Sequence, residues 1–245
     1  MRPALDEIRQ NRIFTVSVSM DLSSYEQNLK IGEACDFVLP TFGVHPKRAP
    51  EYAGGLHDLS RWIDESPALG EIGLDFHWVE DATRYPAQLK VLHYFLAAAR
   101  EQKKLVNLHT KGAERQILDL LEEYEIQRAI IHWYSGPLDL LNAFIDLGVF
   151  FTVGVEVLFS ERIQAVARAI PLEKLLTETD NPGGLKWLRG SVGMPLALRD
   201  VITVLAGLKE TSEKTIREIV QKNLLELTRG DPWLRNAHHQ LAAGD

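Results

Sequence analysis

Glu71-Ile72-Gly73-Leu74-Asp75 places two carboxylates at the end of a short apolar run that begins at Pro67. A carboxylate at the carboxyl end of a buried strand costs free energy unless it is paired or holds a metal. Three other strand-like runs also end on a histidine or an acidic residue: Leu105–His109, Ala129–His132 and Leu175–Asp180. One glutamate, two histidines and one aspartate at the tips of four strands suit one or two divalent metal ions. The sequence therefore predicts a metal site at these strand ends.

The size and composition of the chain are typical of a globular protein with a large core. With 245 residues, it has the length of one α/β barrel domain, which we expect to span residues 1–245. No apolar run reaches the roughly 18 residues of a membrane span, and the first residues lack the apolar core of a signal peptide. Cys35 is the one cysteine, so no internal disulfide is expected. Together these features predict a cytoplasmic protein that does not contact a membrane.

Strand-like and helix-like patterns alternate along the whole chain. Seven β-branched or apolar runs end near Ser19, Gly43, Asp75, His109, His132, Val155 and Asp180. Stretches with apolar residues at helical spacing lie between them, which predicts a parallel sheet covered by helices. The polar residues of interest follow the carboxyl ends of strands, where barrel enzymes carry their active sites. We therefore expect a TIM-type barrel; an open doubly wound sheet is the alternative, but no GxGxxG turn supports it.

The last part of the chain has weaker signals. Residues 181–195 form a glycine-rich stretch without a clear period, which predicts a loop. Two helices should follow, the second capped by Ser212. The tail after Trp233 is interpreted as a solvated end.

Five motifs resemble, in order and spacing, those of the TatD family of metal-dependent deoxyribonucleases. They are Gly43-Val44-His45-Pro46, Gly70–Asp75, Leu108-His109, His132-Trp133-Tyr134-Ser135-Gly136 and Glu178-Thr179-Asp180-Asn181-Pro182. The resemblance covers nearly the whole chain. It implies a distorted (β/α)8 barrel of the amidohydrolase superfamily, with Glu71, His109, His132 and Asp180 as metal ligands and DNA as substrate.

The chain also departs from the family pattern. The family begins with a strand that carries a His-x-His pair, and no such pair occurs before residue 45. The seven strands are therefore interpreted as a barrel without its first strand, either because the start is misassigned or because the chain is naturally shorter. On this interpretation, the strands ending near Ser19 and Asp180 should be separated by a cleft or drawn together. Lys111 stands where the family usually has arginine, and Gly193 replaces an asparagine.

Each candidate residue has a possible chemical role and a plainer one. Glu71 could bind or bridge metals, and Asp180 could orient or deprotonate the attacking water; both are candidate catalytic residues. The plainer alternative is that the four candidate ligands are satisfied polar groups in a barrel core.

The candidate substrate-binding residues are His45, Lys111, Asp75 and Arg189. His45 contacts a phosphate or caps a turn, and Lys111 binds a phosphate or is solvated. Asp75 orients a ligand histidine or caps a helix. Arg189 is a candidate phosphate contact.

The motifs favour hydrolysis of DNA phosphodiester bonds with Mg²⁺, Mn²⁺ or Zn²⁺ as cofactor. The formal net charge of −7 offers no broad basic surface for DNA, so metals and a few local cations would have to meet the phosphates. Two alternatives stay open: hydrolysis of an amide, ester or lactone on the same barrel, and a catalytically impaired binding subunit.

Overall fold

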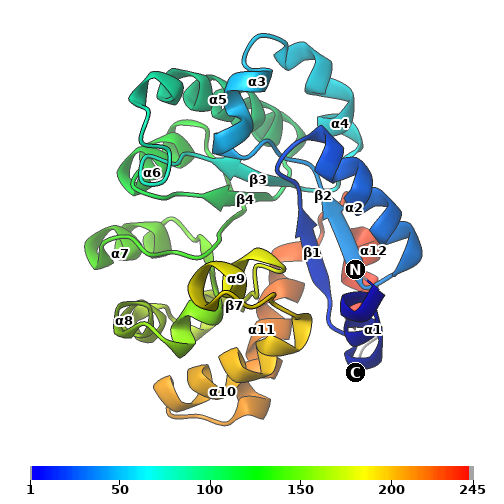
Figure 1. The fold of residues 1–245 in the computed structure, drawn as a ribbon, viewed down its shortest axis with the longest axis vertical. Coiled ribbons are helices and arrows are strands. Elements are labelled where there is room, and N and C mark those ends of the chain that lie inside the picture. Colours follow the sequence, from blue (N-terminus) through cyan, green and yellow to red (C-terminus); the bar gives the residue numbers. More distant parts are fainter. Residues whose placement is uncertain (1, 243–245) are drawn as a thin grey trace.

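The computed structural model describes residues 2–242 and shows an α/β fold built on parallel strands (Figure 1). All seven predicted strands are present: β1 (Thr15–Val18), β2 (Val38–Thr41), β3 (Leu69–Gly73), β4 (Val106–His109), β5 (Ala129–Ile131), β6 (Phe150–Val153) and β7 (Leu175–Thr177). The last five are hydrogen-bonded in sequence order, and β1 pairs with β2. A bridge between Phe42 and Leu69 joins the two sheets.

The strands lie side by side in sequence order, but they do not form a closed hydrogen-bonded barrel among the described residues. The Ser19 N–H, just after β1, donates to the Gly70 carbonyl at 3.1 Å, and the Glu71 N–H donates to the Ser19 carbonyl at 3.0 Å. Across residues 2–242, no strand pairing joins β7 to β1. The expected hydrogen-bonded pairing of these two strands is therefore absent from the described residues, and a cleft between them stays a prediction.

Helices cover the outside of the sheet. They are α1 (Arg2–Asn11), α2 (Leu22–Ala34), α3 (Ala49–Tyr52), α4 (Ser60–Glu65), α5 (Tyr85–Gln102), α6 (Glu114–Glu123), α7 (Leu138–Asp146), α8 (Glu161–Ala169), α9 (Gly183–Arg189), α10 (Leu198–Leu208), α11 (Glu213–Thr228) and α12 (Arg235–Ala242). The helical spacing of apolar residues explains their placement: in α6, for example, Ile117, Leu120 and Leu121 are buried. Ser212 caps α11 by accepting a hydrogen bond from the Thr215 N–H at 3.0 Å, as predicted. No helix of the described chain has the length and apolar character needed to cross a membrane.

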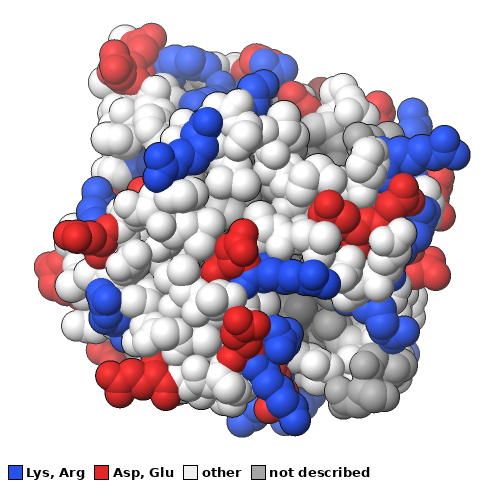
Figure 2. All heavy atoms as spheres, turned by 60° about the horizontal axis from the view of Figure 1, so that its bottom comes forward, with Lys and Arg blue, Asp and Glu red and all other residues white. Residues whose placement is uncertain are grey.

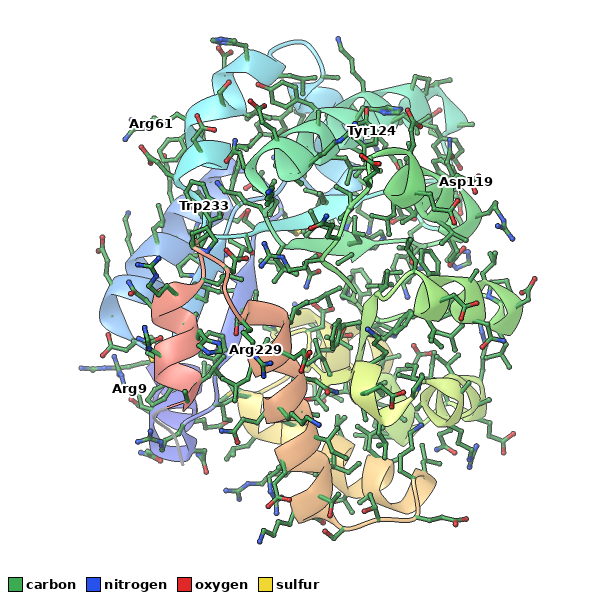
Figure 3. All side chains as sticks on the ribbon, turned by 180° about the vertical axis from the view of Figure 1, so that it is seen from behind. Arg9, Arg61, Asp119, Tyr124, Arg229 and Trp233 are labelled. Atoms are coloured by element: carbon green, nitrogen blue, oxygen red, sulfur yellow. The ribbon has the colours of Figure 1, made fainter. Side chains whose placement is uncertain are left out.

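The described part of the tail, up to Ala242, packs against the rest of the fold, so the prediction of a solvated tail is wrong for these residues. Leu234 and Ala237 are buried, and α12 lies beside α2 (Figure 1). Trp233 covers Lys104, whose Nζ is 3.8 Å from the centre of the indole ring (Figure 3). Lys104 is itself buried and donates to the carbonyls of Ile63 and Asp64. The prediction failed because only a few residues of the tail are apolar, and their partners are distant in sequence.

Part of the predicted loop 181–195 is also helical. α9 occupies Gly183–Arg189 and ends at Gly190, which has the left-handed φ of 75° typical of a helix terminus. Gly184 is its one buried residue, so the helix lacks the apolar stripe from which it could have been predicted.

Candidate metal centre

The candidate ligands meet at the carboxyl ends of the strands. Glu71 lies within β3, His109 ends β4 and His132 follows β5 directly. Asp180 comes three residues after β7 ends, and His45 four residues after β2. Because parallel strands all point the same way, these ends share one side of the sheet, as the sequence pattern predicted.

Glu71 is the centre of the cluster. Its Oε1 atom lies 2.7 Å from His109 Nδ1 and 2.8 Å from His132 Nε2. Burial acts to raise the pKa of the Glu71 carboxyl, but the charge of His132 and hydrogen bonds from both histidines hold that pKa well below its usual range. For His132, burial acts to lower the pKa of the ring, and the carboxylates of Glu71 and Glu178 raise it well above its usual value. The cluster is therefore held together as a buried set of charge-assisted hydrogen bonds.

Two further carboxylates orient the histidines by contacting the ring nitrogens that do not face Glu71. Asp75 Oδ2 lies 3.3 Å from His109 Nε2, and Glu178 Oε2 lies 3.4 Å from His132 Nδ1. Asp75 is fully buried, and its Oδ1 accepts hydrogen bonds from the N–H groups of His77 and Trp78 at 3.1 and 2.7 Å. These contacts favour the orienting role considered for Asp75 over direct contact with a substrate.

Gly73 allows β3 and β4 to approach closely enough for this arrangement. Its φ is 148°, and a Cβ atom at this position would lie 2.0 Å from the His109 carbonyl oxygen. The Leu74 N–H donates to that same carbonyl at 3.0 Å. A side chain at residue 73 would therefore displace the backbone that carries His109.

His45 lies beside the cluster and contacts Glu71 through one ring nitrogen. Its Nδ1 accepts from the Lys47 N–H at 3.1 Å, and its Nε2 lies 3.5 Å from Glu71 Oε1. Burial lowers the pKa of the ring to about 4, so the ring is neutral near pH 7. A neutral ring that accepts at Nδ1 carries its hydrogen on Nε2. His45 thus caps a turn with Nδ1, which is one of the two roles considered for it, and its Nε2–H faces Glu71. Contact of His45 with a phosphate stays a prediction.

Asp180 makes no hydrogen bond or ion pair with Glu71, His109 or His132 among the described residues, so its role as a metal ligand stays a prediction. It adopts a left-handed φ of 49°, a conformation that aspartate tolerates better than most residues, and its carbonyl accepts from the Gly184 N–H at 2.7 Å. Burial raises the pKa of the Asp180 carboxyl to about 6. The charges of His132, Glu178 and Glu71 also act on this pKa, so Asp180 shares the electrostatic environment of the candidate ligands.

Neither of the two basic candidates contacts Glu71, His109 or His132 directly among the described residues. Lys111 is buried, and its Nζ donates to the Trp133 carbonyl and to Ser135 Oγ, so the idea of a solvated loop lysine is wrong. It fastens the loop that follows His132. Arg189 is exposed at the end of α9, with its guanidinium 3.9 Å from the centre of the Phe159 ring. A phosphate contact by Arg189 stays a prediction.

The side chains fit a divalent cation. His45, Glu71 and His109 each offer a ligand atom within 4.8 Å of the others. The buried atoms His109 Nε2, Asp75 Oδ2 and Glu178 Oε1 have no well-formed hydrogen bond among the described residues. A mixed set of imidazole and carboxylate donors suits Zn²⁺ or Mn²⁺. Of the three grouped residues, His45 fits a ligand role least, because binding metal at Nε2 would require moving its hydrogen to Nδ1 and losing the bond from Lys47.

Several residues of the site were not predicted. Glu178 contacts His132, and Thr152 supports Glu178 with a hydrogen bond of 2.6 Å. The sequence does hold a signal for Glu178, because it stands two residues before Asp180 and a strand repeats every two residues. Gln88 was also missed: its side chain bonds both the N–H and the carbonyl of Asp75.

Solved structures similar to this chain define the class of fold. YjjV, a TatD homologue from Escherichia coli K12, superimposes with a TM-score of 0.84 at 22% identity and covers 92% of this chain and 90% of its own. A TatD-family hydrolase from Entamoeba histolytica gives a TM-score of 0.78 at 20% identity, with 91% and 87% covered. The fold is thus that of the TatD-type α/β barrels. The model of the TatD-related DNases matches residues 3–229, and the chain belongs to that family.

Relatives in sequence are named for two kinds of activity. An uncharacterized metal-dependent hydrolase from Methanocaldococcus jannaschii is 26% identical over 223 residues, which are 89% of this chain and 86% of that protein. Human deoxyribonuclease TATDN3 is 26% identical over 235 residues, covering 89% of this chain and 85% of its own.

Proposed function

We propose that this protein is a metal-dependent deoxyribonuclease that cleaves DNA phosphodiester bonds with an activated water. The observation that carries the proposal is the contact of the buried Glu71 carboxylate with His109 and His132, each at the carboxyl end of its own strand. Membership of the TatD-related DNase family and the names of relatives support DNA as the substrate.

In this proposal, one group of residues holds the metal ion at the scissile phosphate, and a second group orients the first. Glu71, His109 and His132 would hold a divalent cation, while Asp75 and Glu178 fix the orientation of the two rings. Such a cation, when bound, lowers the pKa of a water molecule and neutralises charge on the phosphate.

Proton transfer falls to Asp180 in this proposal. A carboxyl with a pKa of about 6 is largely ionised at neutral pH, yet basic enough to accept a proton from water as that water attacks. Asp180 follows β7 and precedes α9, and its carboxyl group is within electrostatic reach of His132, Glu178 and Glu71.

His45 would contact the phosphate. Its Nε2–H points toward the cluster, and the Lys47 N–H holds the ring in the tautomer that has this donor. A donor to a non-bridging phosphate oxygen gains strength as negative charge develops there in the transition state.

The charge on one face of the molecule agrees with recognition of DNA at the site rather than along a wide basic groove. On the face seen in Figure 2, lysine and arginine residues are interspersed with aspartate and glutamate residues and form no continuous basic patch. Affinity for DNA would then depend on few phosphate contacts and only weakly on salt.

The test is hydrolysis by the protein loaded in turn with Mg²⁺, Mn²⁺ and Zn²⁺. Single-stranded DNA carrying a label at either end, RNA of the same sequence and a panel of esters, amides and lactones are the substrates. DNA cleavage that disappears in Glu71→Gln supports the proposal. Turnover of esters or lactones alone would instead favour the small-molecule alternative, and metal binding without any turnover would favour an impaired binding subunit.

A further inference from the structure

Two exposed tryptophans stand beside the metal centre. Trp78 and Trp187 are 41% and 61% exposed, and their rings meet edge to face with centres 5.3 Å apart. The Trp78 ring is also 6.0 Å from the ring of His109. Large aromatic surfaces left in solvent next to a candidate active site mark a binding surface more often than a structural one.

Lys47 adds a positive charge to this surface. Its Nζ lies 5.0 Å from the centre of the Trp187 ring and 5.7 Å from that of Trp78. We call Lys47, Trp78 and Trp187 together the tryptophan platform. Cation–π contact with two rings holds the ammonium group of Lys47 next to both indoles.

The three residues come from three segments that follow strand ends of the site, and Trp187 lies within α9. Lys47 follows His45 by two residues, Trp78 follows Asp75 by three, and Trp187 follows Asp180 by seven. The Trp78 N–H is anchored directly to Asp75 Oδ1 at 2.7 Å. The platform is therefore fixed relative to the candidate ligands. Trp187 of α9, which follows β7, reaches Trp78, which follows β3.

A structural pairing of the two tryptophans alone does not account for these contacts. Packing would remove the indoles from water, yet more than half of Trp187 stays exposed. The Nζ of the buried Lys111 lies 5.5 Å from the centre of the Trp78 ring, so this ring has two ammonium groups near it, those of Lys47 and Lys111. An electropositive, solvent-exposed aromatic surface suits a flat, electron-rich and anionic ligand.

We propose that the tryptophan platform binds single-stranded DNA, with one base stacked on the indoles and the adjoining phosphate near Lys47. This inference rests on the proposed function and adds the form of the substrate to it. Stacking on aromatic side chains needs an unstacked base, which a single strand or a strand end offers and the interior of a duplex does not. The platform would thereby place a free strand end with its phosphate over the cluster of Glu71.

The experiment measures binding without cleavage, using metal-free protein and fluorescein-labelled oligonucleotides in an anisotropy assay. Trp187→Ala and Trp78→Ala should each weaken binding of a single strand by about 5- to 100-fold. Trp187→Phe should retain most of the affinity because it keeps a stacking face. Lys47→Gln should reduce the slope of log affinity against log salt by about 0.7, the value for one phosphate contact with a single strand. Trp233→Leu, at the opposite end of β4, is the matched control and should bind as the parent does.

An oligonucleotide with one abasic residue, moved along the strand, separates stacking from a general loss of structure. At one position, the abasic residue should weaken binding to the parent protein. At that same position it should not further weaken binding to Trp187→Ala, because this variant already lacks the stacking contact. Equal binding by the parent and both alanine variants, equal loss at every abasic position, or equal binding of single strand and blunt duplex would each overturn the platform. If the binding results are as expected but the metal-loaded parent does not cleave DNA, only the proposed nuclease function is refuted. Cleavage that is unaffected by the tryptophan variants would refute the platform alone.

Discussion

His132 is held between two carboxylates: its Nε2 lies 2.8 Å from Glu71 Oε1 and its Nδ1 lies 3.4 Å from Glu178 Oε2. A ring with partners on both nitrogens cannot rotate without losing one of them. Glu178 is in turn supported by Thr152, so His132 after β5, Thr152 in β6 and Glu178 after β7 together set the direction of the imidazole. The relationship makes Glu178 a positioning residue for a candidate ligand.

Removing the charge of Glu178 should therefore weaken metal binding. Glu178→Gln keeps the size of the side chain but offers the ring a weaker partner, and we expect a loss of metal affinity of about 10- to 100-fold. Titration calorimetry with Mn²⁺ or Zn²⁺ measures it. Glu173→Gln, an exposed residue before β7, is the control. The same affinity in Glu178→Gln and the parent would show that His132 needs no second carboxylate.

Metal binding itself should depend on the two histidines of the cluster. We expect the double variant His109→Ala/His132→Ala to lose bound Mn²⁺ or Zn²⁺, because two of the three groups in direct contact are removed. Metal content after dialysis, determined by mass spectrometry, is the readout. The double variant His57→Ala/His239→Ala removes two exposed histidines and should bind as the parent does. Equal metal content in the first variant and the parent would rule the site out.

Asp180 should matter more for rate than for folding. Asp180→Asn keeps the volume and the left-handed backbone position, which asparagine also tolerates. We expect DNA hydrolysis to fall by at least about 10²-fold, the scale of a positioned general base, with little change in the melting temperature. An unchanged rate would remove Asp180 from the mechanism.

The fold was predictable wherever the periodicity of apolar residues recorded burial. Seven apolar runs predicted seven strands, and their polar ends predicted that Glu71, His109 and His132 would meet. The helices that were missed, α3, α9 and α12, bury only one residue each. Such short helices owe their position to contacts with distant parts of the chain, which local patterns do not record.

The details of the site were less predictable because they depend on where side chains point. The buried Lys111 reaches the loop after His132 instead of solvent, and Trp78 meets Trp187 across 109 residues of sequence. Neither contact follows from spacing along a strand or helix. The tautomer of His45 likewise depends on a single backbone N–H, that of Lys47.

Lys104 should give the protein an unusual dependence of stability on pH. Burial lowers the pKa of its ammonium group to about 8 in the folded state, against about 10.4 for an unfolded chain. Between these values the unfolded state binds more protons, so this group makes the free energy of unfolding rise with pH, by on the order of 1 kcal/mol per pH unit at most. Below pH 8 the contribution is constant.

Lys104→Met isolates that effect. The variant lacks the titrating group, so the difference in free energy of unfolding between parent and variant should change from pH 8 to 10 and stay level from pH 6 to 7.5. Urea denaturation at each pH measures it. A difference that is the same at every pH would mean that Lys104 keeps its ordinary pKa in the fold.

Gly73→Ala should damage the fold and the metal centre together. A Cβ atom at residue 73 would lie 2.0 Å from the His109 carbonyl oxygen, and the φ of 148° is strained for any residue with a side chain. Relief requires moving β3 away from β4, so we expect a loss of at least about 2 kcal/mol in stability, and weaker metal binding because His109 shifts from Glu71. Gly54→Ala is the matched control, since a Cβ there would meet no atom within 4 Å. Chemical denaturation and metal titration of both variants provide the comparison. Equal stability of Gly73→Ala and Gly54→Ala would show that the close approach of β3 and β4 does not position the site.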